Sequence, residues 1–191
     1  DLSPLQMQGL ASALRPSGAL ELRITFDQRI FVPGIPEAAL PGLIAEATRL
    51  GLAASDHPSS TRLVVCTGPE TCNRGLVNSK ALAKELQHLD LPIALHISGC
   101  QNGCSQNLAA PLSLQGMVRS GAKGRQPHYQ LRIGRPVQAD GLTFGPVLAT
   151  LGARRVRMAL ERLLVLWKEQ PEGLSFDAWL EQRGSQGLVE D

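Results

Sequence analysis

Four cysteines, the only ones in the chain, constrain this sequence more than any other feature. They form two close pairs, Cys66-x5-Cys72 and Cys100-x3-Cys104. Two thiol pairs on separate turns can converge on one site, and a 4Fe-4S cluster needs four thiolates, one for each iron. The spacing therefore favours an iron-sulfur site with all four cysteines as ligands.

Each cysteine pair follows a short apolar run. Arg62–Val65 precedes the first pair and Ile93–Ile97 precedes the second. We expect both runs to be strands, with one helix from Cys72 through Gln87 and a second beginning at Cys104. Backbone N-H groups at a helix start have no intrahelical partner, so they can donate to thiolate or cluster sulfur and offset its negative charge.

Three other interpretations of the cysteines compete with a cluster. Structural zinc more often uses Cys-x2-Cys pairs, which the longer spacings here match poorly. An even number of cysteines permits disulfides, but a chain of this length does not need them, and no signal peptide indicates an oxidising compartment. Four unconnected buried thiols are the third alternative, and the repeated setting of the two pairs argues against it.

The cysteine motifs resemble those of a known family, the siroheme-containing sulfite and nitrite reductases. The matching features are the Cys-x5-Cys pair with the long helical stretch after it, and the sequence HISGCQNGC from His96 to Cys104. Leu22–Pro36 is similar to the segment that opens the second of the family's two internal repeats. The resemblance extends from about residue 10 to the C-terminus, and the cysteine motifs are its specific part.

The resemblance implies separate roles for the cysteines. In that family the last cysteine bridges the cluster to the siroheme iron, which implies this role for Cys104. Cys66, Cys72 and Cys100 would then hold only the 4Fe-4S cluster.

Four further residues are implied by the resemblance as neighbours of the siroheme. Asn102 and the backbone around Thr67 would lie near the macrocycle, and Arg23 and Gln28 would face the cofactor from the upstream segment. The residue pattern alone favours solvated strand and turn positions for Arg23 and Gln28.

Composition narrows the function classes. The 191 residues are 43% hydrophobic, enough to bury one core with a small additional lobe. A net charge of +2 does not argue for nucleic acid, and no apolar stretch is long enough to span a bilayer. Without a targeting sequence we expect a cytoplasmic protein, although Asp1 is not a natural initiator residue and a processed precursor stays open.

Periodicity predicts two domains and an α/β (α+β) fold. Residues 1–58 form half of a ferredoxin-like domain, in the order helix, two strands and helix; the expected elements are 3–14, 20–25, 30–32 and 36–50. The Ser-, Asp-, His- and Pro-containing stretch 54–60 is the predicted linker.

Residues 59–191 form the predicted siroheme and 4Fe-4S domain, built on a mixed sheet. Beyond the cysteine pairs we expect strands at Pro111–Val118 and His128–Ile133, joined by a loop at Arg119–Gln126. Arg154–Lys168 has the stripe of a core-packed amphipathic helix, and Phe176–Gln182 is expected to be a short closing helix before a loose tail.

Charge is unevenly distributed along the chain. No acidic residue occurs between Asp90 and Asp140, whereas five basic residues do: Arg119, Lys123, Arg125, Arg132 and Arg135. This region suits an anionic partner such as the siroheme carboxylates, an oxyanion substrate or an acidic electron donor, and it also fits an ordinary solvated hairpin. His96, inside the strand before Cys100, is interpreted as structural.

The resemblance implies a six-electron reduction of sulfite or nitrite, with ferredoxin or a flavoprotein as electron donor. The family's main substrate-binding Arg and Lys residues belong to its first half, and the resemblance implies that this sequence begins near the second repeat, so we assign no catalytic acid or base. A missing N-terminal half, a second subunit or a second copy would supply them. A precorrin oxygenase of cobalamin biosynthesis, a non-catalytic 4Fe-4S electron-transfer subunit and, least favoured, a zinc-stabilised binding module are the alternatives.

Overall fold

The chain divides into two compact units, Asp1–Pro58 and Ser59–Asp191. The structure, a computed structural model, describes residues 2–19, 21–25, 28–53, 63–122, 124–134, 145–170 and 173–184. The predicted linker at 54–60 lies outside these residues. No helix in the part described is long and apolar enough to cross a lipid bilayer.

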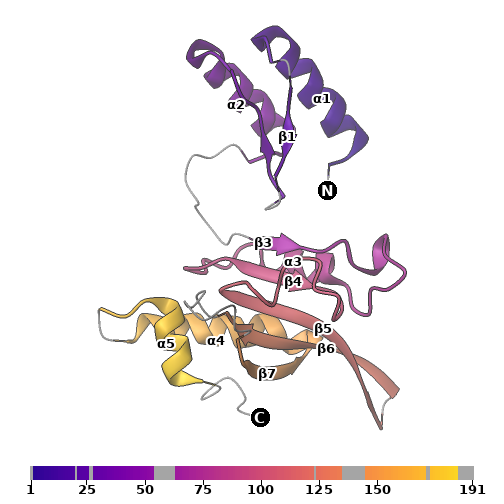
Figure 1. The fold of residues 1–191 in the computed structure, drawn as a ribbon, viewed down its shortest axis with the longest axis vertical. Coiled ribbons are helices and arrows are strands. Elements are labelled where there is room, and N and C mark those ends of the chain that lie inside the picture. The colour runs from indigo at the N-terminus through magenta and orange to yellow at the C-terminus, as the bar shows by residue number, and fades with distance from the viewer. Residues whose placement is uncertain are drawn as a thin grey trace, which may run out of the picture. The chain divides into compact units, whose positions relative to one another are not determined.

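Two helices and a two-stranded antiparallel sheet make up the first unit (Figure 1). Helix α1 begins after Ser3, whose hydroxyl accepts from the Gln6 backbone while the Gln6 side chain accepts from the Ser3 N-H. This reciprocal cap satisfies two N-H groups that the helix leaves free. The elements are α1 (Pro4–Leu14), β1 (Arg23–Ile24), β2 (Ile30–Phe31) and α2 (Leu40–Arg49), with 3-10 turns at Arg15–Ser17 and Glu37–Ala39.

The predicted element order of the first unit is confirmed, with shorter strands than expected. Gly18 and Gly51 follow the two helical segments with φ of 78° and 74°, a left-handed conformation that glycine adopts without a steric penalty. The Gln6 side-chain amide donates to the Leu50 carbonyl at 2.9 Å and so links α1 to the end of α2.

A mixed five-stranded sheet organises the second unit, which confirms the predicted α/β class. The strands lie in chain order: β3 (Leu63–Val65), β4 (Leu95–Ser98), β5 (Leu112–Gly121), β6 (Gly124–Ile133) and β7 (Val147–Gly152). The β3, β4 and β5 strands are parallel to one another, and β6 and β7 continue the sheet antiparallel.

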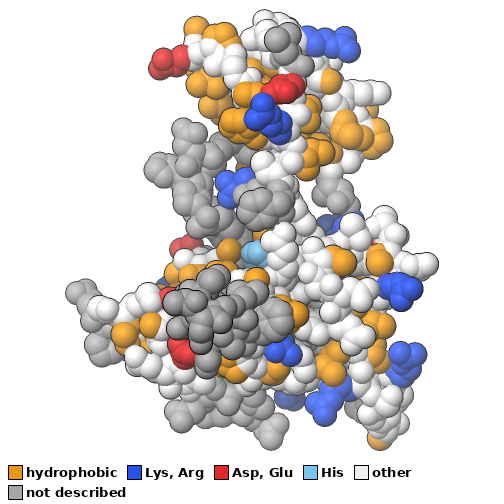
Figure 2. Space-filling view, viewed as in Figure 1, with side chains coloured by type: hydrophobic (Ala, Val, Ile, Leu, Met, Phe, Trp, Pro, Cys, Tyr) orange, Lys and Arg blue, Asp and Glu red, His pale blue; other side chains and the backbone are white. Residues whose placement is uncertain are grey.

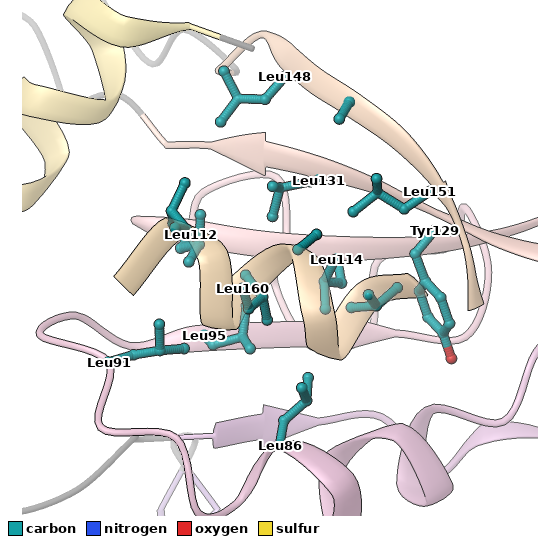
Figure 3. Packing of buried hydrophobic residues seen from close by; sticks show 14 of the residues in the cluster. Leu86, Leu91, Leu95, Leu112, Leu114, Tyr129, Leu131, Leu148, Leu151 and Leu160 are labelled. Atoms are coloured by element: carbon teal, nitrogen blue, oxygen red, sulfur yellow. The ribbon is translucent and has the colours of Figure 1, made fainter. Parts of the chain in front are cut away.

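Side chains along each strand alternate between the two faces of this sheet, and the hydrophobic core lies on one of these faces. In β5, Leu112 and Leu114 are fully buried in the hydrophobic cluster. Helices α3 (Ser79–Leu86) and α4 (Val156–Lys168) contribute to the same cluster, and Figure 3 shows Leu160 of α4 among leucines of the neighbouring strands. The predicted helix at 154–168 is confirmed, as is the closing helix, α5 (Phe176–Arg183).

The helix predicted to begin at Cys72 begins seven residues later, at Ser79. Asn78 is its N-cap, with a side-chain oxygen that accepts from the Ala81 N-H at 2.9 Å. Residues 71–78 instead form turns, because the Leu76 and Val77 N-H groups bond to the Gly99 carbonyl rather than within a helix.

The helix predicted to begin at Cys104 does not form, since the described residues 101–110 are a series of turns. Gly103 and Gln106 have φ of 69° and 57°, which a right-handed helix excludes. The bonds Gln106 N-H to Gly103 O and Ala109 N-H to Gln106 O close two of these turns.

Two further differences concern the strands. The loop predicted at 119–126 is mostly strand, because β5 and β6 stay paired as far as Gly121 and Gly124. Strand β7, which pairs with β6, was not expected from the sequence.

Candidate metal centre

Parallel pairing brings the two cysteine turns to one edge of the sheet. Val65 of β3 pairs with Ile97 of β4, so the carboxyl ends of these strands lie side by side. Cys66 directly follows β3, and its N-H extends the ladder by donating to the Ile97 carbonyl at 3.0 Å. Cys100 follows β4 after Gly99.

Direct hydrogen bonds interlock the two turns. The Gly99 N-H donates to the Cys66 Sγ at 3.0 Å, and the Gly99 carbonyl accepts from the Leu76 and Val77 N-H groups at 3.0 and 3.1 Å. A Cβ at position 99 would lie 2.7 Å from the Val77 carbonyl oxygen, so the approach requires glycine. The turn of the first pair is thus built onto the start of the second.

Helix α3 contributes a second polar group to Cys66. The Ser79 hydroxyl lies 3.3 Å from the Cys66 Sγ and donates to the Cys66 carbonyl at 3.0 Å. Sequence reasoning missed Ser79, because the helix was expected to run through it. Asn73, Gly75 and Asn78 could have indicated the later helix start.

Two serines fasten the second turn at its ends. The Ser98 and Ser105 hydroxyls are 2.7 Å apart, and the Ser105 N-H donates to the Ser98 hydroxyl at 3.2 Å. Both serines are buried. The segment from Cys100 to Cys104 is therefore held as a closed loop on the edge of the sheet.

His96 supports this closed loop from the sheet. Its Nδ1 donates to the Ser105 carbonyl, 2.5 Å away, which fixes the tautomer with the proton on Nδ1. Burial lowers the pKa of His96, while the bond to Ser105 acts in the opposite direction. These contacts agree with a structural role for His96.

The four thiols differ in exposure. Cys100 is buried, Cys66 and Cys72 are half-buried, and Cys104 is exposed. Among the described residues no three His, Cys, Asp or Glu side chains gather closely enough to hold a single metal ion. A 4Fe-4S cluster is bound through one thiolate per iron, so its ligands surround the cluster instead of meeting at one point.

The geometry near Cys66 fits such an anionic group. Its sulfur accepts from the Gly99 N-H and lies 3.3 Å from the Ser79 hydroxyl, and groups of both kinds can stabilise a thiolate. The Tyr129 hydroxyl is buried with no hydrogen-bond partner among the described residues. Burial raises the pKa of Tyr129, with smaller contributions from Cys66 and Glu85.

The other predicted site residues lie on the surface. Thr67 and Asn102 are exposed in the first and second cysteine turns. In the first unit Arg23 is exposed and ion-paired with Glu21, and Gln28 is exposed with φ of 63°. Arg23 and Gln28 belong to the first compact unit and the cysteines to the second, and the roles of these two residues stay predictions.

A shallow groove of about 540 Å³ lies beside the first cysteine turn. Its lining combines that turn with the β5–β6 hairpin: Pro69, Gly75, Leu76, Val77, Asn78, Val118, Arg125 and Pro127. Arg119 and Arg125 are exposed on this hairpin, and Arg132 is half-buried, while Lys123 and Arg135 lie outside the described residues. Figure 2 shows Lys and Arg side chains on the side of the second unit where the hairpin ends.

Parts of this chain are similar to known nitrite and sulfite reductases. Residues 1–50 match the family described as the nitrite/sulfite reductase ferredoxin-like half domain. The ferredoxin–nitrite reductase of Synechococcus elongatus is 37% identical over 106 residues, which is 52% of this chain and 21% of that protein. The ferredoxin sulfite reductase of Mycobacterium tuberculosis is 27% identical over 147 residues, 70% of this chain and 26% of that protein.

A solved structure agrees with these relatives. The Mycobacterium tuberculosis NirA protein matches with a TM-score of 0.80 at 25% identity, covering 97% of this chain and 37% of that one. The chain thus spans about a fifth to a quarter of the length of these curated relatives. In the half domain, the relatives and the shared fold, the chain is similar to nitrite and sulfite reductases.

Proposed function

We propose that this chain is the part of a siroheme-dependent nitrite or sulfite reductase that holds the 4Fe-4S cluster and one wall of the siroheme site. The observation that carries the proposal is the interlocking of the two cysteine turns at the carboxyl edge of β3 and β4. Four cysteines in two pairs on adjacent turns supply the ligand number that the cluster needs.

The exposure of the thiols supports different roles for them. Cys66, Cys72 and Cys100 are buried or half-buried and would hold the cluster alone. Cys104 is the exposed member of the second pair, as a ligand shared with a second cofactor at the protein surface requires. Thr67 and Asn102, exposed on the same two turns, would border the macrocycle.

Residues of this chain would act on the cluster through charge and position. The Gly99 N-H and the Ser79 hydroxyl offset negative charge on the Cys66 sulfur, and the pair Ser98 and Ser105 fixes the second turn. When bound, the cluster and siroheme together would supply the electrons for oxyanion reduction one at a time. We assign no proton donor, because the family's main substrate-binding Arg and Lys residues belong to its first half.

The first unit would require a complementary half domain. It has a two-stranded sheet and exposed apolar side chains, and Figure 2 shows such side chains spread over its surface. Those most relevant to a sheet partner are Leu22, Ile24 and Phe31. Since a two-stranded sheet is marginal in water, a second half domain would cover it, from the same polypeptide or another subunit. Arg23 and Gln28 would face the siroheme from this unit.

An acidic electron donor would approach the basic hairpin. Arg119 and Arg125 are exposed on the hairpin, and the stretch from 91 to 139 contains no acidic residue. The Synechococcus and Mycobacterium relatives are named as ferredoxin enzymes. We therefore propose ferredoxin as the donor, steered by charge, with weaker binding at high salt.

Anaerobic purification, alone and with candidate partners, tests the proposal through iron and sulfide analysis and an absorption spectrum. We expect iron and acid-labile sulfide in equal amounts when the chain holds the cluster alone, and siroheme bands with one further iron once the complementary half is present. Iron and sulfide without siroheme in every preparation would favour a non-catalytic electron-transfer subunit. Activity with a precorrin in place of sulfite or nitrite would favour the oxygenase, and zinc would contradict the cluster.

Cys104→Ser is the variant that tests the bridging role. We expect it to weaken both the cluster and the coupling between cluster and siroheme, whereas Cys66→Ser should act through the cluster alone. Electron paramagnetic resonance of the reconstituted protein measures that coupling. Retention of both cofactors and their magnetic coupling in Cys104→Ser would show that another residue bridges them.

A further inference from the structure

The Cys66 sulfur has a buried serine hydroxyl beside it that the cysteine motifs do not include. Ser79 is fully buried, at 0% exposure, and is the first residue of α3. Its Oγ lies 3.3 Å from the Cys66 Sγ and 3.0 Å from the Cys66 carbonyl oxygen. A hydroxyl has one proton, so it donates fully to only one of these two acceptors at a time.

The protonation state of Cys66 decides between the two acceptors. In the free thiol, the S-H can donate to the Ser79 oxygen while the Ser79 O-H donates to the Cys66 carbonyl. A metal-bound cysteine is a thiolate, which has no proton to give and is a charged acceptor. Hydrogen bonds to charged acceptors are stronger than those to a neutral carbonyl, so the O-H turns to the sulfur.

Surrounding residues hold the hydroxyl in place. The Asn78 cap fixes the start of α3, and Gly68 leaves the space that the hydroxyl needs. A Cβ on Gly68 would lie 2.6 Å from the Ser79 Oγ, and φ of 66° at Gly68 also favours glycine. Ser79 is thus held rigidly at hydrogen-bond distance from the sulfur.

We propose that Ser79 is a positioning residue that donates a hydrogen bond to the Cys66 thiolate and thereby raises the reduction potential of the cluster. This inference rests on the proposed function, because it takes Cys66 as a cluster ligand. Reduction adds negative charge to a cluster, and donors to its sulfurs stabilise that charge. Loss of the hydroxyl therefore makes the cluster harder to reduce.

Redox titration of the reconstituted chain, followed by electron paramagnetic resonance, tests the role. We expect Ser79→Ala to shift the midpoint potential to a more negative value than in the unchanged protein. Ser113→Ala is the matched control, because Ser113 is also a fully buried serine and its hydroxyl has no partner among the described residues. An equal potential in Ser79→Ala and Ser113→Ala would overturn the inference.

If Ser79→Ala does not retain its cluster, an isosteric pair of variants tests the same role. Ser79→Thr keeps the hydroxyl and Ser79→Val replaces it with a methyl group of similar size. We expect Ser79→Thr to hold more cluster, at a higher potential, than Ser79→Val, and identical behaviour of the pair would count against Ser79. Absence of iron and sulfide from the unchanged protein would instead overturn the proposed function itself, before any variant is compared.

Discussion

The two units of the chain differ in how much apolar surface they bury. In the first unit the buried apolar side chains among the described residues are Leu10, Leu14 and Ala47. The second unit has a continuous core between its sheet and helices α3, α4 and α5 (Figure 3). Because burial of apolar area drives folding, we infer that the second unit is stable by itself, whereas the first depends on further elements.

The largest expected difference between the units is in the free energy of unfolding that is lost when a buried side chain is shortened. Leu160→Ala removes a fully buried side chain from the core of the second unit and should cost about 2–5 kcal/mol. Val165→Ala, at an exposed position of the same helix, is the control and should change stability far less. Urea unfolding followed by the fluorescence of Trp167 and Trp179, both in this unit, measures the change.

The corresponding change in the first unit should affect that unit alone. Leu10→Ala should leave the tryptophan transition of the second unit unaltered, since Leu10 lies in the other compact unit. If Leu10→Ala destabilised that transition as much as Leu160→Ala does, the two units would not unfold independently.

A smaller loss of stability is expected where the cysteine turns pack against the sheet. A Cβ on Gly116 would lie 2.2 Å from the Val77 Cγ2 and 2.7 Å from the Gly99 carbonyl oxygen, so Gly116→Ala must displace these turns. We expect a cost of about 1–3 kcal/mol and reduced iron uptake after anaerobic reconstitution. Gly121→Ala, with nothing within 4 Å of the added carbon, is the matched control. Normal iron uptake by Gly116→Ala would show that this packing does not position the site.

The pH dependence of the second unit should include a modest contribution from His96. Burial holds the pKa of His96 below its ordinary value of 6.5, so the unfolded chain binds more protons in the interval between the two values. Stability is therefore lost as the pH falls through about 6.5. His96→Asn can keep a donor to the Ser105 carbonyl without titrating, and its melting temperature should decrease less between pH 7.5 and pH 5.5, about one unit either side of the ordinary pKa. An equal decrease in both proteins would exclude His96 as the cause.

The smallest effect on the chain alone is expected at the sheet of the first unit. Ile24 is 80% exposed, so Ile24→Lys should change stability by no more than about 0.5 kcal/mol. The same change should weaken association with a complementary half domain, measurable by co-purification. Thr48→Lys, an exposed position on α2, serves as the control. Undiminished association of Ile24→Lys would mean that another surface carries the pairing.

Regular patterns made much of the fold predictable. The stripe that includes Leu160 and Leu163 predicted α4, and the Ser3 cap with Pro4 marked the start of α1, because both depend on neighbouring residues alone. The helix expected at Cys72 failed because the Leu76 and Val77 N-H groups find their acceptor at Gly99, far along the chain. Sequence periodicity does not indicate a hydrogen bond between residues so distant in the chain.

The sequence predicts candidate ligands for the site, and these stay predictions, but it does not indicate the groups that contact them. The spacing of the cysteines indicated the ligand set, since spacing is a local property. Ser79 and the Gly99 N-H act on Cys66 only because parallel pairing joins two turns that are distant in sequence. We expected N-H groups at helix starts to contact the cysteines, whereas in the structure the Ser79 hydroxyl and the Gly99 N-H contact Cys66.

Hydrogen exchange of the whole chain, before and after anaerobic cluster reconstitution, measures whether the two cysteine turns form one cofactor site. We expect iron and sulfide binding to slow amide exchange in residues 66–79 and 98–105 together, and to leave the first unit unchanged. Iron and sulfide bound with protection in only one turn, or in neither, would contradict a single site built from both.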